Sequence, residues 1–418
     1  MTAIEELNQK GKLAKDASYQ LAVLPTETKN QALLAMADAL CKETAFLLEE
    51  NAKDLAQGEA NGMSKGLLDR LALSESRIDA MAEGLRQIAA LSDPIGEVLT
   101  QTTRPNGLEI KKVRVPLGVI GIIYEARPNV TADAAGLCIK SGNTVILRGG
   151  KEAAYSNRAI VKVMQKSGYG AGLPTGSINL VEDTSRESAT ALMRLNDYLD
   201  VIIPRGGAGL IRAVVENATV PAIETGTGNC HVYVDASADL AMAKEIVINA
   251  KTQRPSVCNA EEKLLVHTSV AKTFLPDMLS ALAERNVTII GDTKTCSLYP
   301  DAIPATEEDW GTEYLDLKLG VKVVDSLEDA ISHINCYNSK HSEAIITNDP
   351  SAAQKFQNEV DAAAVYVNAS TRFTDGFEFG FGAEIGISTQ KIHARGPMGL
   401  AELTSTKYMI CGTGQTRG

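Results

Sequence analysis

The chain has 418 residues, of which 44% are hydrophobic and 22% are charged, a balance typical of soluble globular enzymes and not of disordered or fibrous chains. Lys and Arg total 41 against 52 Asp and Glu, and the resulting net charge of −11 makes nucleic acid an unfavourable partner. At about 150 residues per domain, this length predicts about three structural units. The apolar run at 119–124 is too short to cross a membrane, and the N-terminus lacks the pattern of a signal peptide. We therefore expect a cytoplasmic protein.

The first hundred residues are predicted to be mostly helical. Apolar residues recur at helical spacing from Thr26 to about Leu55, and again from Ser74 to Leu91. Pro94 and Gly96 end this region. Apolar and basic residues alternate over Leu108–Val115, which predicts a strand with one face exposed to solvent or a strand at the edge of a sheet.

Beyond Pro116, short β-rich runs alternate with helical stretches, which predicts parallel sheets with helical crossovers. A first series of strands is predicted over Gly118–Tyr124, Thr144–Arg148, Ser177–Val181 and Asp200–Pro204. A second series is predicted over His231–Asp235, Lys263–His267, Val287–Gly291, Val321–Val324, Ala344–Thr347 and Ala364–Asn368, with helices over Leu240–Lys251 and Ala271–Glu284. The two series meet at the glycine-rich segment Glu224–Asn229, the best candidate for a domain boundary. Because ligands collect at the carboxyl ends of parallel strands, we expect the chemistry in loops that follow strands.

The seven cysteines form no CxxC pair, and the five histidines include no HExxH motif. His333 and His341 are eight residues apart, a spacing that does not place two ligands on one helical face. We therefore predict neither a disulfide framework nor a metal site.

Cys258 is the strongest candidate for a reactive side chain. It lies in the polar segment 253–260, between a predicted helix and a predicted strand and close to Arg254. A nearby cation favours the thiolate, which is the nucleophilic form of cysteine. Simple packing is the more common role of a cysteine, and we expect it for Cys41 and Cys138, which lie among apolar residues.

Two glycine-containing segments follow strands and could face an anion. Gly206 and Gly207 open a predicted helix, although a tight turn without a ligand explains them equally well. Arg148 and Lys151 flank two glycines at a strand end, which suits a nucleotide ribose and its phosphate, and a solvated loop is the alternative. The chain has neither a GxGxxG nor a Walker A motif.

Several separate motifs follow the order and spacing of the aldehyde dehydrogenase superfamily. These motifs are Gly118–Gly121, Ser141–Val145, Glu224-Thr-Gly and Cys258. Their longer forms resemble the gamma-glutamyl phosphate reductase family within that superfamily. The longer forms cover Tyr124–Thr131, Leu147–Glu152, Glu224–His231 and Arg395–Leu400. The likeness runs through nearly the whole chain, and the agreement of independent segments makes it specific.

The resemblance implies an aldehyde dehydrogenase-like α/β fold with two parallel α/β domains and a small β oligomerisation element, and hence a homo-oligomer. It implies a nucleotide-binding domain over 1–97 and 117–228, a catalytic domain over 229–394, and an oligomerisation element over 98–116 and 395–418. The implied reaction is reduction of L-glutamyl 5-phosphate by NADPH to L-glutamate 5-semialdehyde in proline biosynthesis. Glutamate 5-kinase is then the expected pathway neighbour, and dimer and tetramer are not distinguished.

In the implied chemistry, the Cys258 thiolate displaces phosphate to form a thioester, and hydride from the nicotinamide reduces that thioester. Each addition places negative charge on one oxygen, and the Cys258 amide with the Asn129 side chain are the candidate donors. In a gapless comparison Arg127 falls on the family's asparagine, so Arg127 could instead bind a substrate carboxylate or phosphate. Glu224 matches an acid that activates water in oxidising relatives. Because reduction must avoid that water, the role of Glu224 here could be structural or in cofactor positioning.

The resemblance also suggests the cofactor and further contacts. Where oxidising relatives commonly carry lysine and then glutamate, this chain has Arg148 and Lys151, which favours NADPH because cations attract the ribose 2′-phosphate. Glu313 matches the family's acid that binds the nicotinamide ribose. The suspected substrate contacts are Arg127 and Arg254, and, by their position alone in the polar loop after Ala364–Asn368, Ser370, Arg372 and Phe373. The alternatives are an aldehyde or acyl-CoA-linked dehydrogenase with another substrate, and an inactive nucleotide-binding homologue.

Overall fold

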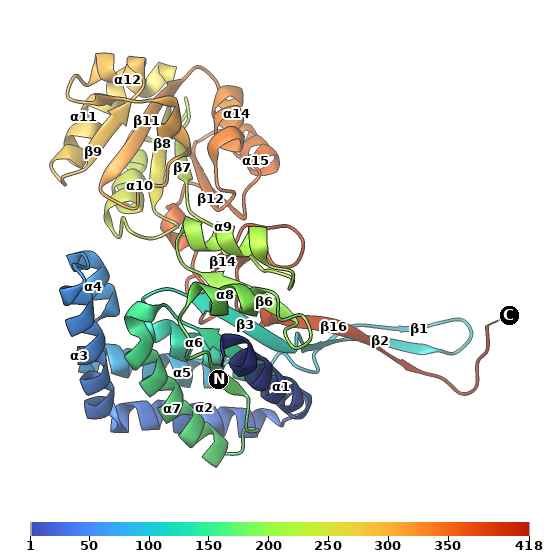
Figure 1. Cartoon of the computed structure of the whole chain (residues 1–418). Helices are drawn as coiled ribbons and strands as arrows, with labels where there is room; N and C mark the ends of the chain where they lie inside the picture. The colour runs from blue at the N-terminus through green and yellow to red at the C-terminus, as the bar shows by residue number, and fades with distance from the viewer. Residues whose placement is uncertain (1, 418) are drawn as a thin grey trace. The chain divides into compact units, whose positions relative to one another are not determined.

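The computed structural model describes residues 2–417, which divide into two compact units (Figure 1). The first unit runs to Glu224 and also contains Gly380–Gly386 and the chain from Met398 onward. The second unit contains Thr225–Phe379 and Ile387–Pro397. The first transition between the units thus falls inside the glycine-rich segment 224–229. No helix in the described part of the chain combines the length and the hydrophobicity that a membrane span requires.

The N-terminal part of the first unit is helical, as its hydrophobic periodicity predicts. Its helices are α1 (Ala3–Leu21), α2 (Thr26–Lys42), α3 (Thr44–Ala60), α4 (Lys65–Leu71) and α5 (Glu75–Ala90). The periodic stretch from Thr26 to about Leu55 is divided between α2 and α3, because the chain turns at Glu43, where the Thr44 hydroxyl donates to the Cys41 carbonyl at 2.8 Å. The Ser74 hydroxyl caps α5 by accepting a hydrogen bond from the Arg77 amide.

A four-stranded parallel sheet in the order β5-β4-β3-β6 forms the centre of the first unit. Its strands are β3 (Val119–Tyr124), β4 (Thr144–Arg148), β5 (Ile178–Leu180) and β6 (Val201–Arg205). The helical elements that follow them are α6 (Pro128–Lys140), the short 3₁₀ helix η1 (Lys151–Ala153), α7 (Ala154–Gly170), α8 (Arg186–Met193) and α9 (Ala208–Asn217). Leu7 of α1 packs with Ile123, Ile146 and Ile202 of the sheet, so one face of the sheet is covered by α1. Four of the predicted strands are therefore confirmed, each within two residues.

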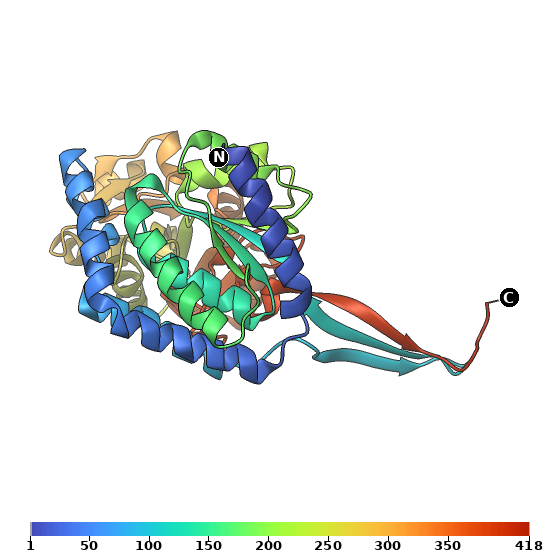
Figure 2. The same ribbon diagram turned by 60° about the horizontal axis from the view of Figure 1, so that its bottom comes forward.

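Three antiparallel strands of the first unit form a separate ribbon that extends away from the four-stranded sheet (Figures 1 and 2). They are β1 (Val98–Thr103), β2 (Glu109–Pro116) and β16 (Thr404–Cys411), and β2 pairs with both others. The strand predicted over Leu108–Val115 is β2. The C-terminal segment supplies β16, which pairs with β2 and makes the ribbon a three-stranded sheet.

The second unit contains a seven-stranded parallel sheet in the order β10-β9-β11-β8-β7-β12-β13. Its strands are β7 (Cys230–Val234), β8 (Glu261–His267), β9 (Thr288–Gly291), β10 (Ile303–Pro304), β11 (Lys318–Val324), β12 (Ser342–Ile346) and β13 (Ala364–Val367). Its helices are α10 (Leu240–Thr252), α11 (Thr268–Ala283), α12 (Thr293–Leu298), α13 (Glu307–Gly311), α14 (Leu327–Tyr337), α15 (Pro350–Glu359) and the short 3₁₀ helix η2 (Thr371–Phe373). A small antiparallel pair, β14 (Ile387–Ser388) with β15 (Gly396–Pro397), completes the unit, and η3 (Ala401–Leu403) belongs to the first unit. The two-residue strand β10 lies outside the predicted set.

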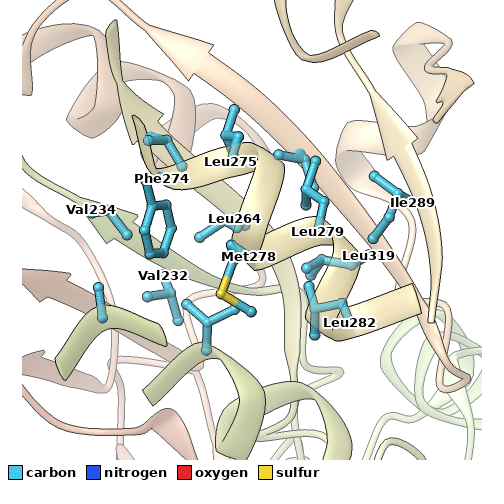
Figure 3. Close-up of a cluster of buried hydrophobic side chains, with 14 of the residues drawn as sticks. Val232, Val234, Leu264, Phe274, Leu275, Met278, Leu279, Leu282, Ile289 and Leu319 are labelled. Carbon is cyan, nitrogen blue, oxygen red and sulfur yellow. The ribbon is translucent and has the colours of Figure 1, made fainter. Parts of the chain in front are cut away.

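The core of the second unit holds the central strands in place. Helix α11 packs Phe274 and Met278 against strand residues such as Val232 and Leu264 (Figure 3). Tyr233, which alternates with its neighbours along β7, packs in a second cluster that includes residues of α14 and α15. Each such buried side chain contributes about 1.5–3 kcal/mol. Burial on both faces therefore fixes β8, β7 and β12 as three adjacent parallel strands.

Candidate active site

The loops that lead into β8, β7 and β12 meet at one edge of the second sheet, because these three strands are adjacent and parallel. Cys258 lies just before β8, His341 directly before β12, and Gly228 just before β7. The candidate nucleophile thus lies in a loop that precedes a strand, whereas we expected the chemistry in loops that follow strands. The segment after α10 returns the chain to the amino edge of the sheet, and this return segment carries the thiol.

Cys258 and His341 form the central pair of this edge. The Cys258 Sγ lies 3.1 Å from Nε2 of His341, and the two residues are 83 positions apart in sequence. His341 is fully buried, whereas Cys258 is partly exposed. Burial lowers the pKa of His341 to about 4, so its imidazole is neutral at pH 7 and can accept a proton at one nitrogen. A thiol within hydrogen-bond reach of a neutral histidine is the arrangement of an activated nucleophile.

Sequence reasoning missed this role of His341. In the sequence, the spacing of His341 from His333 only argues against a metal site. No local pattern links His341 to Cys258, since the two residues precede strands that lie two positions apart in the sheet. The sequence does contain one indication that His341 and Cys258 lie at the same edge of the sheet, because both residues precede strands of one predicted parallel sheet.

The second ring nitrogen of His341 begins a series of short polar contacts. Nδ1 lies 2.8 Å from the Ser342 Oγ, which lies 2.6 Å from the Thr374 Oγ1. The Tyr366 hydroxyl lies 2.7 Å from the same Thr374 oxygen. Cys230 lies nearby, with its Sγ 3.9 Å from Nδ1, and donates to the Cys258 carbonyl at 3.2 Å.

Arg372 interacts electrostatically with both Cys258 and Arg254. Burial, followed by repulsion from Arg254, lowers the pKa of the Arg372 guanidinium, and the Cys258 thiolate opposes this shift. The Arg372 Nε donates to the Gln253 side chain at 2.8 Å, and Ser370 caps η2 by accepting from the Arg372 amide. Two neighbouring guanidinium groups favour an anionic ligand.

The turn that carries Arg372 is joined to the loop that carries the thiol. The Asn259 side chain donates to the carbonyls of Arg372 and Thr374, at 3.2 and 3.0 Å. In return, the Thr371 hydroxyl donates to the Asn259 carbonyl at 2.7 Å. Of the predicted substrate contacts, Arg254, Ser370 and Arg372 therefore lie in one cluster with the Cys258 loop.

Gly228 packs directly against the backbone of Cys258. A Cβ at Gly228 would lie 1.4 Å from the Cys258 carbonyl oxygen. The Gly228 amide donates to the Glu313 carboxylate at 2.6 Å, and burial raises the pKa of Glu313. Glu313 therefore holds the loop that packs against the Cys258 backbone. Glu224 precedes this loop and is the residue at which the chain leaves the first unit.

In the first unit, a cavity of about 650 Å³ opens where β3 and β4 end. Its lining includes Lys151 at the start of η1, Arg127 in the loop after β3, and Arg70 of α4. The Arg148 guanidinium instead donates to the carbonyls of Thr184 and Ser185, at 2.7 and 2.8 Å. Lys151 thus lines this cavity, whereas Arg148 supports the loop after β5.

The start of α9 confirms that Gly206 and Gly207 open a helix. The Gly207 amide donates to the Glu125 carboxylate at 3.0 Å, so the anion at these glycines is a side chain of the chain itself. Asn129 lies exposed in the first turn of α6, where its side chain donates to Asp133 at 3.1 Å. Burial raises the pKa of Asp133 to about 6.

Comparison with known proteins finds relatives across the whole chain. A sequence model of the aldehyde dehydrogenase family matches residues 4–296. The gamma-glutamyl phosphate reductase of Moorella thermoacetica is 63% identical over 417 residues, covering 100% of both chains, and that of Enterococcus faecalis is 60% identical over 414 residues, covering 99% of both. The crystal structure of the Thermotoga maritima gamma-glutamyl phosphate reductase is 50% identical, with a TM-score of 0.97 over 99% of this chain and 100% of that one. An acetylating aldehyde dehydrogenase from Geobacillus thermoglucosidasius, at 19% identity and a TM-score of 0.69 over 100% of this chain and 98% of that one, shares the fold.

Proposed function

The chain belongs to the aldehyde dehydrogenase family and, within it, to the gamma-glutamyl phosphate reductases, and we propose that it reduces L-glutamyl 5-phosphate to L-glutamate 5-semialdehyde. The proposed reaction uses NADPH, releases phosphate and is a step of proline biosynthesis. The predicted aldehyde dehydrogenase-like fold is confirmed by the structural relatives. The observation that carries the proposal is the contact of 3.1 Å between the Cys258 thiol and His341, beside two arginines.

Cys258 is the proposed nucleophile. Its sulfur bonds to the acyl carbon of the substrate while the bond from that carbon to the phosphate oxygen breaks, and phosphate leaves with the electron pair. When bound, the reduced nicotinamide supplies the hydride that reduces the thioester carbonyl. The carbon–sulfur bond then breaks, which releases the aldehyde and restores the Cys258 thiolate.

His341 is the proposed acceptor of the thiol proton. Its imidazole is buried and neutral, and its Nε2 is within hydrogen-bond reach of the sulfur. A positioned base of this kind raises reaction rates by about 10²–10⁴-fold. Because phosphate is a good leaving group, the site has little need of a second group to protonate it.

Arg254 and Arg372 are the proposed phosphate ligands. Their proximity to each other and to Cys258 suits a dianionic acyl phosphate, which would relieve their mutual repulsion. Ser370 supports this role by capping the turn that carries Arg372. The roles of Asn129, Arg127 and Glu224 stay predictions.

The first unit has residues that fit NADPH. Its cavity lies at the carboxyl ends of β3 and β4, the edge at which parallel sheets bind nucleotides. Lys151 is exposed there and is the proposed ligand of the ribose 2′-phosphate. The roles of Arg148, Gly206, Gly207 and Glu313 in binding the cofactor stay predictions.

We further propose that the first unit binds the nucleotide, that the second unit is catalytic, and that the β1-β2-β16 ribbon is the oligomerisation element. The ribbon supports this role by exposing apolar side chains such as Tyr408 and Ile410 of β16. The cytoplasmic location and glutamate 5-kinase as the pathway neighbour stay predictions.

The proposed function is tested in the reverse direction, by following NADPH formation from glutamate semialdehyde and NADP⁺. We expect the reaction to require inorganic phosphate or arsenate and to disappear in Cys258→Ala. Turnover without either anion would instead indicate an aldehyde dehydrogenase with a different substrate. Nucleotide binding without any turnover in the wild type would indicate an inactive homologue.

A further inference from the structure

The side chain of Asn259 fastens the turn that carries Arg372 to the loop that carries Cys258. Its amide nitrogen donates to the carbonyls of Arg372 and Thr374, at 3.2 and 3.0 Å. The Thr371 hydroxyl donates to the Asn259 carbonyl at 2.7 Å. Asn259 is 6% exposed and Thr371 is fully buried, so water competes little for these three bonds. The turn and the loop are therefore held together.

This attachment links two groups of the site directly. Asn259 is the residue that follows Cys258 in the chain, and Arg372 lies in η2. The Arg372 Nε also donates to the side chain of Gln253, which ends α10 just before the Cys258 loop. Arg372 is thus held at its backbone through Asn259 and at its guanidinium through Gln253.

Asn259 has one feature that packing alone does not explain. Its side-chain oxygen is buried and has no hydrogen-bond partner in the part of the chain that the structure describes. A buried polar atom without a partner lowers stability, so such a residue needs a reason other than packing. The two bonds that its amide nitrogen donates to the turn of Arg372 supply that reason.

A guanidinium that is already in place binds an anion more tightly than a mobile one. An arginine side chain loses much conformational freedom when it binds a ligand, and a side chain held beforehand has less freedom to lose. Orientation matters as well, because the planar guanidinium binds phosphate through paired hydrogen bonds. Contacts that fix the backbone and the Nε of Arg372 therefore favour phosphate binding.

We propose that Asn259 is a positioning residue, which holds Arg372 where its guanidinium binds the phosphate group of the acyl phosphate beside the Cys258 sulfur. This inference rests on the proposed function, in which Arg372 is a phosphate ligand. Asn259 acts through Arg372 and needs no contact with the substrate or the nicotinamide. In the reverse reaction, the same contact positions the inorganic phosphate that attacks the thioester.

The position of Cys258 has support that does not involve the Asn259 side chain. The Cys258 Sγ lies 3.1 Å from Nε2 of His341, and its carbonyl accepts from the Cys230 thiol at 3.2 Å. Gly228 packs against the same backbone. Loss of the Asn259 side chain should therefore affect the binding of phosphate more than the reaction of the sulfur.

The test compares Asn259→Ala with Asn179→Ala in the full-length enzyme. Asn179 is a matched control, because it is 5% exposed and its side chain donates to two main-chain carbonyls, those of Val145 and Gly176, in the first unit. The assay follows NADPH formation from glutamate semialdehyde and NADP⁺. It yields kcat and separate KM values for inorganic phosphate, semialdehyde and NADP⁺.

We expect Asn259→Ala to raise KM for phosphate about tenfold, because a single hydrogen bond of this kind changes an equilibrium constant by about two- to tenfold and two bonds are lost. The KM values for semialdehyde and NADP⁺ should stay within about twofold of the wild type and kcat within about threefold, with Asn179→Ala unchanged for phosphate within about twofold. An unchanged KM for phosphate in Asn259→Ala would overturn the inference. A similar change in all three KM values would also overturn it, because that result indicates a general disturbance of the site.

A second pair of variants decides the question if Asn259→Ala does not fold. Thr371→Val removes the hydroxyl that donates to the Asn259 carbonyl, whereas Thr371→Ser keeps it. We expect Thr371→Val to raise KM for phosphate about threefold or more, with Thr371→Ser within about twofold of the wild type. Equal values in the Val and Ser variants would overturn the inference.

Arg372→Gln separates this inference from the proposed function. We expect this variant to raise KM for phosphate at least as much as Asn259→Ala, because it removes the ligand itself. If Arg372→Gln leaves that KM unchanged, the proposed phosphate ligand is wrong and the inference falls with it. If Arg372→Gln raises it and Asn259→Ala and Thr371→Val do not, the positioning role alone fails. Turnover of the wild type without phosphate would instead contradict the proposed function.

Discussion

Substitution of Gly228 by alanine tests whether the position of the Cys258 backbone limits catalysis. An added Cβ would lie 1.4 Å from the Cys258 carbonyl oxygen, and van der Waals contact begins at about 3.4 Å, so one of the two loops must move by about 2 Å. The φ angle of Gly228 lies outside the positive range that disfavours alanine, so the expected effect is steric. The Gly228 amide is also bonded to Glu313 at 2.6 Å, which resists movement of its own loop.

A misplacement of about 1 Å at a reacting group can reduce the rate about 10²-fold. We therefore expect Gly228→Ala to lower kcat by at least that factor, which corresponds to about 2.7 kcal/mol in the activation barrier. The assay is phosphate-dependent NADPH formation from glutamate semialdehyde, with thermal unfolding measured in parallel. Gly311→Ala is the matched control in the same unit, because an added Cβ there meets no atom within 4 Å. A Gly228→Ala enzyme with kcat within threefold of the control would refute the reasoning.

Three further predictions concern the thiol, the cofactor and pH. Cys258→Ala should abolish reduction while NADPH affinity, measured by calorimetry, stays within about twofold, and residual turnover would contradict the covalent mechanism. Lys151→Glu should lower kcat/KM for NADPH relative to kcat/KM for NADH, because a carboxylate repels the ribose 2′-phosphate. An unchanged ratio of these two values would contradict the role of Lys151 as the 2′-phosphate ligand. Burial lowers the pKa of His341 in the folded chain to about 4, below the ordinary value of 6.5. Between these two pH values the unfolded chain binds more protons than the folded chain. The stability that the neutral His341 contributes above pH 6.5 is therefore lost as the pH falls toward 4. The wild type should therefore lose about 3 kcal/mol more stability on acidification than His341→Gln, at about 1.4 kcal/mol for each pKa unit. Denaturant titrations at pH 7 and pH 4.5 measure this loss for both proteins. Equal losses in the variant and the wild type would count against a buried neutral imidazole.

The amino-acid sequence by itself determined most elements and led to Cys258 as the predicted nucleophile. Periodicity within short windows and a capping residue such as Ser74 are local properties, so they locate α5 and the strands β3 and β4 to within a few residues. The glycine-rich segment 224–229 marked the change between the two units. Motifs spread along the chain identified the family, and the polar segment around Cys258 predicts the thiol as the reactive group.

Only the tertiary structure decided which groups surround that thiol. Strand order places β12 two positions from β8, and so brings His341 to Cys258 across 83 residues. The same applies to the pairing of β16 with β2 and to the close approach of Gly228 to the Cys258 carbonyl. It also applies to the carboxylate of Glu125, which occupies the start of α9. Such contacts join segments that are distant in the chain, and they depend on how strands are ordered and packed, which periodicity within a short window does not encode.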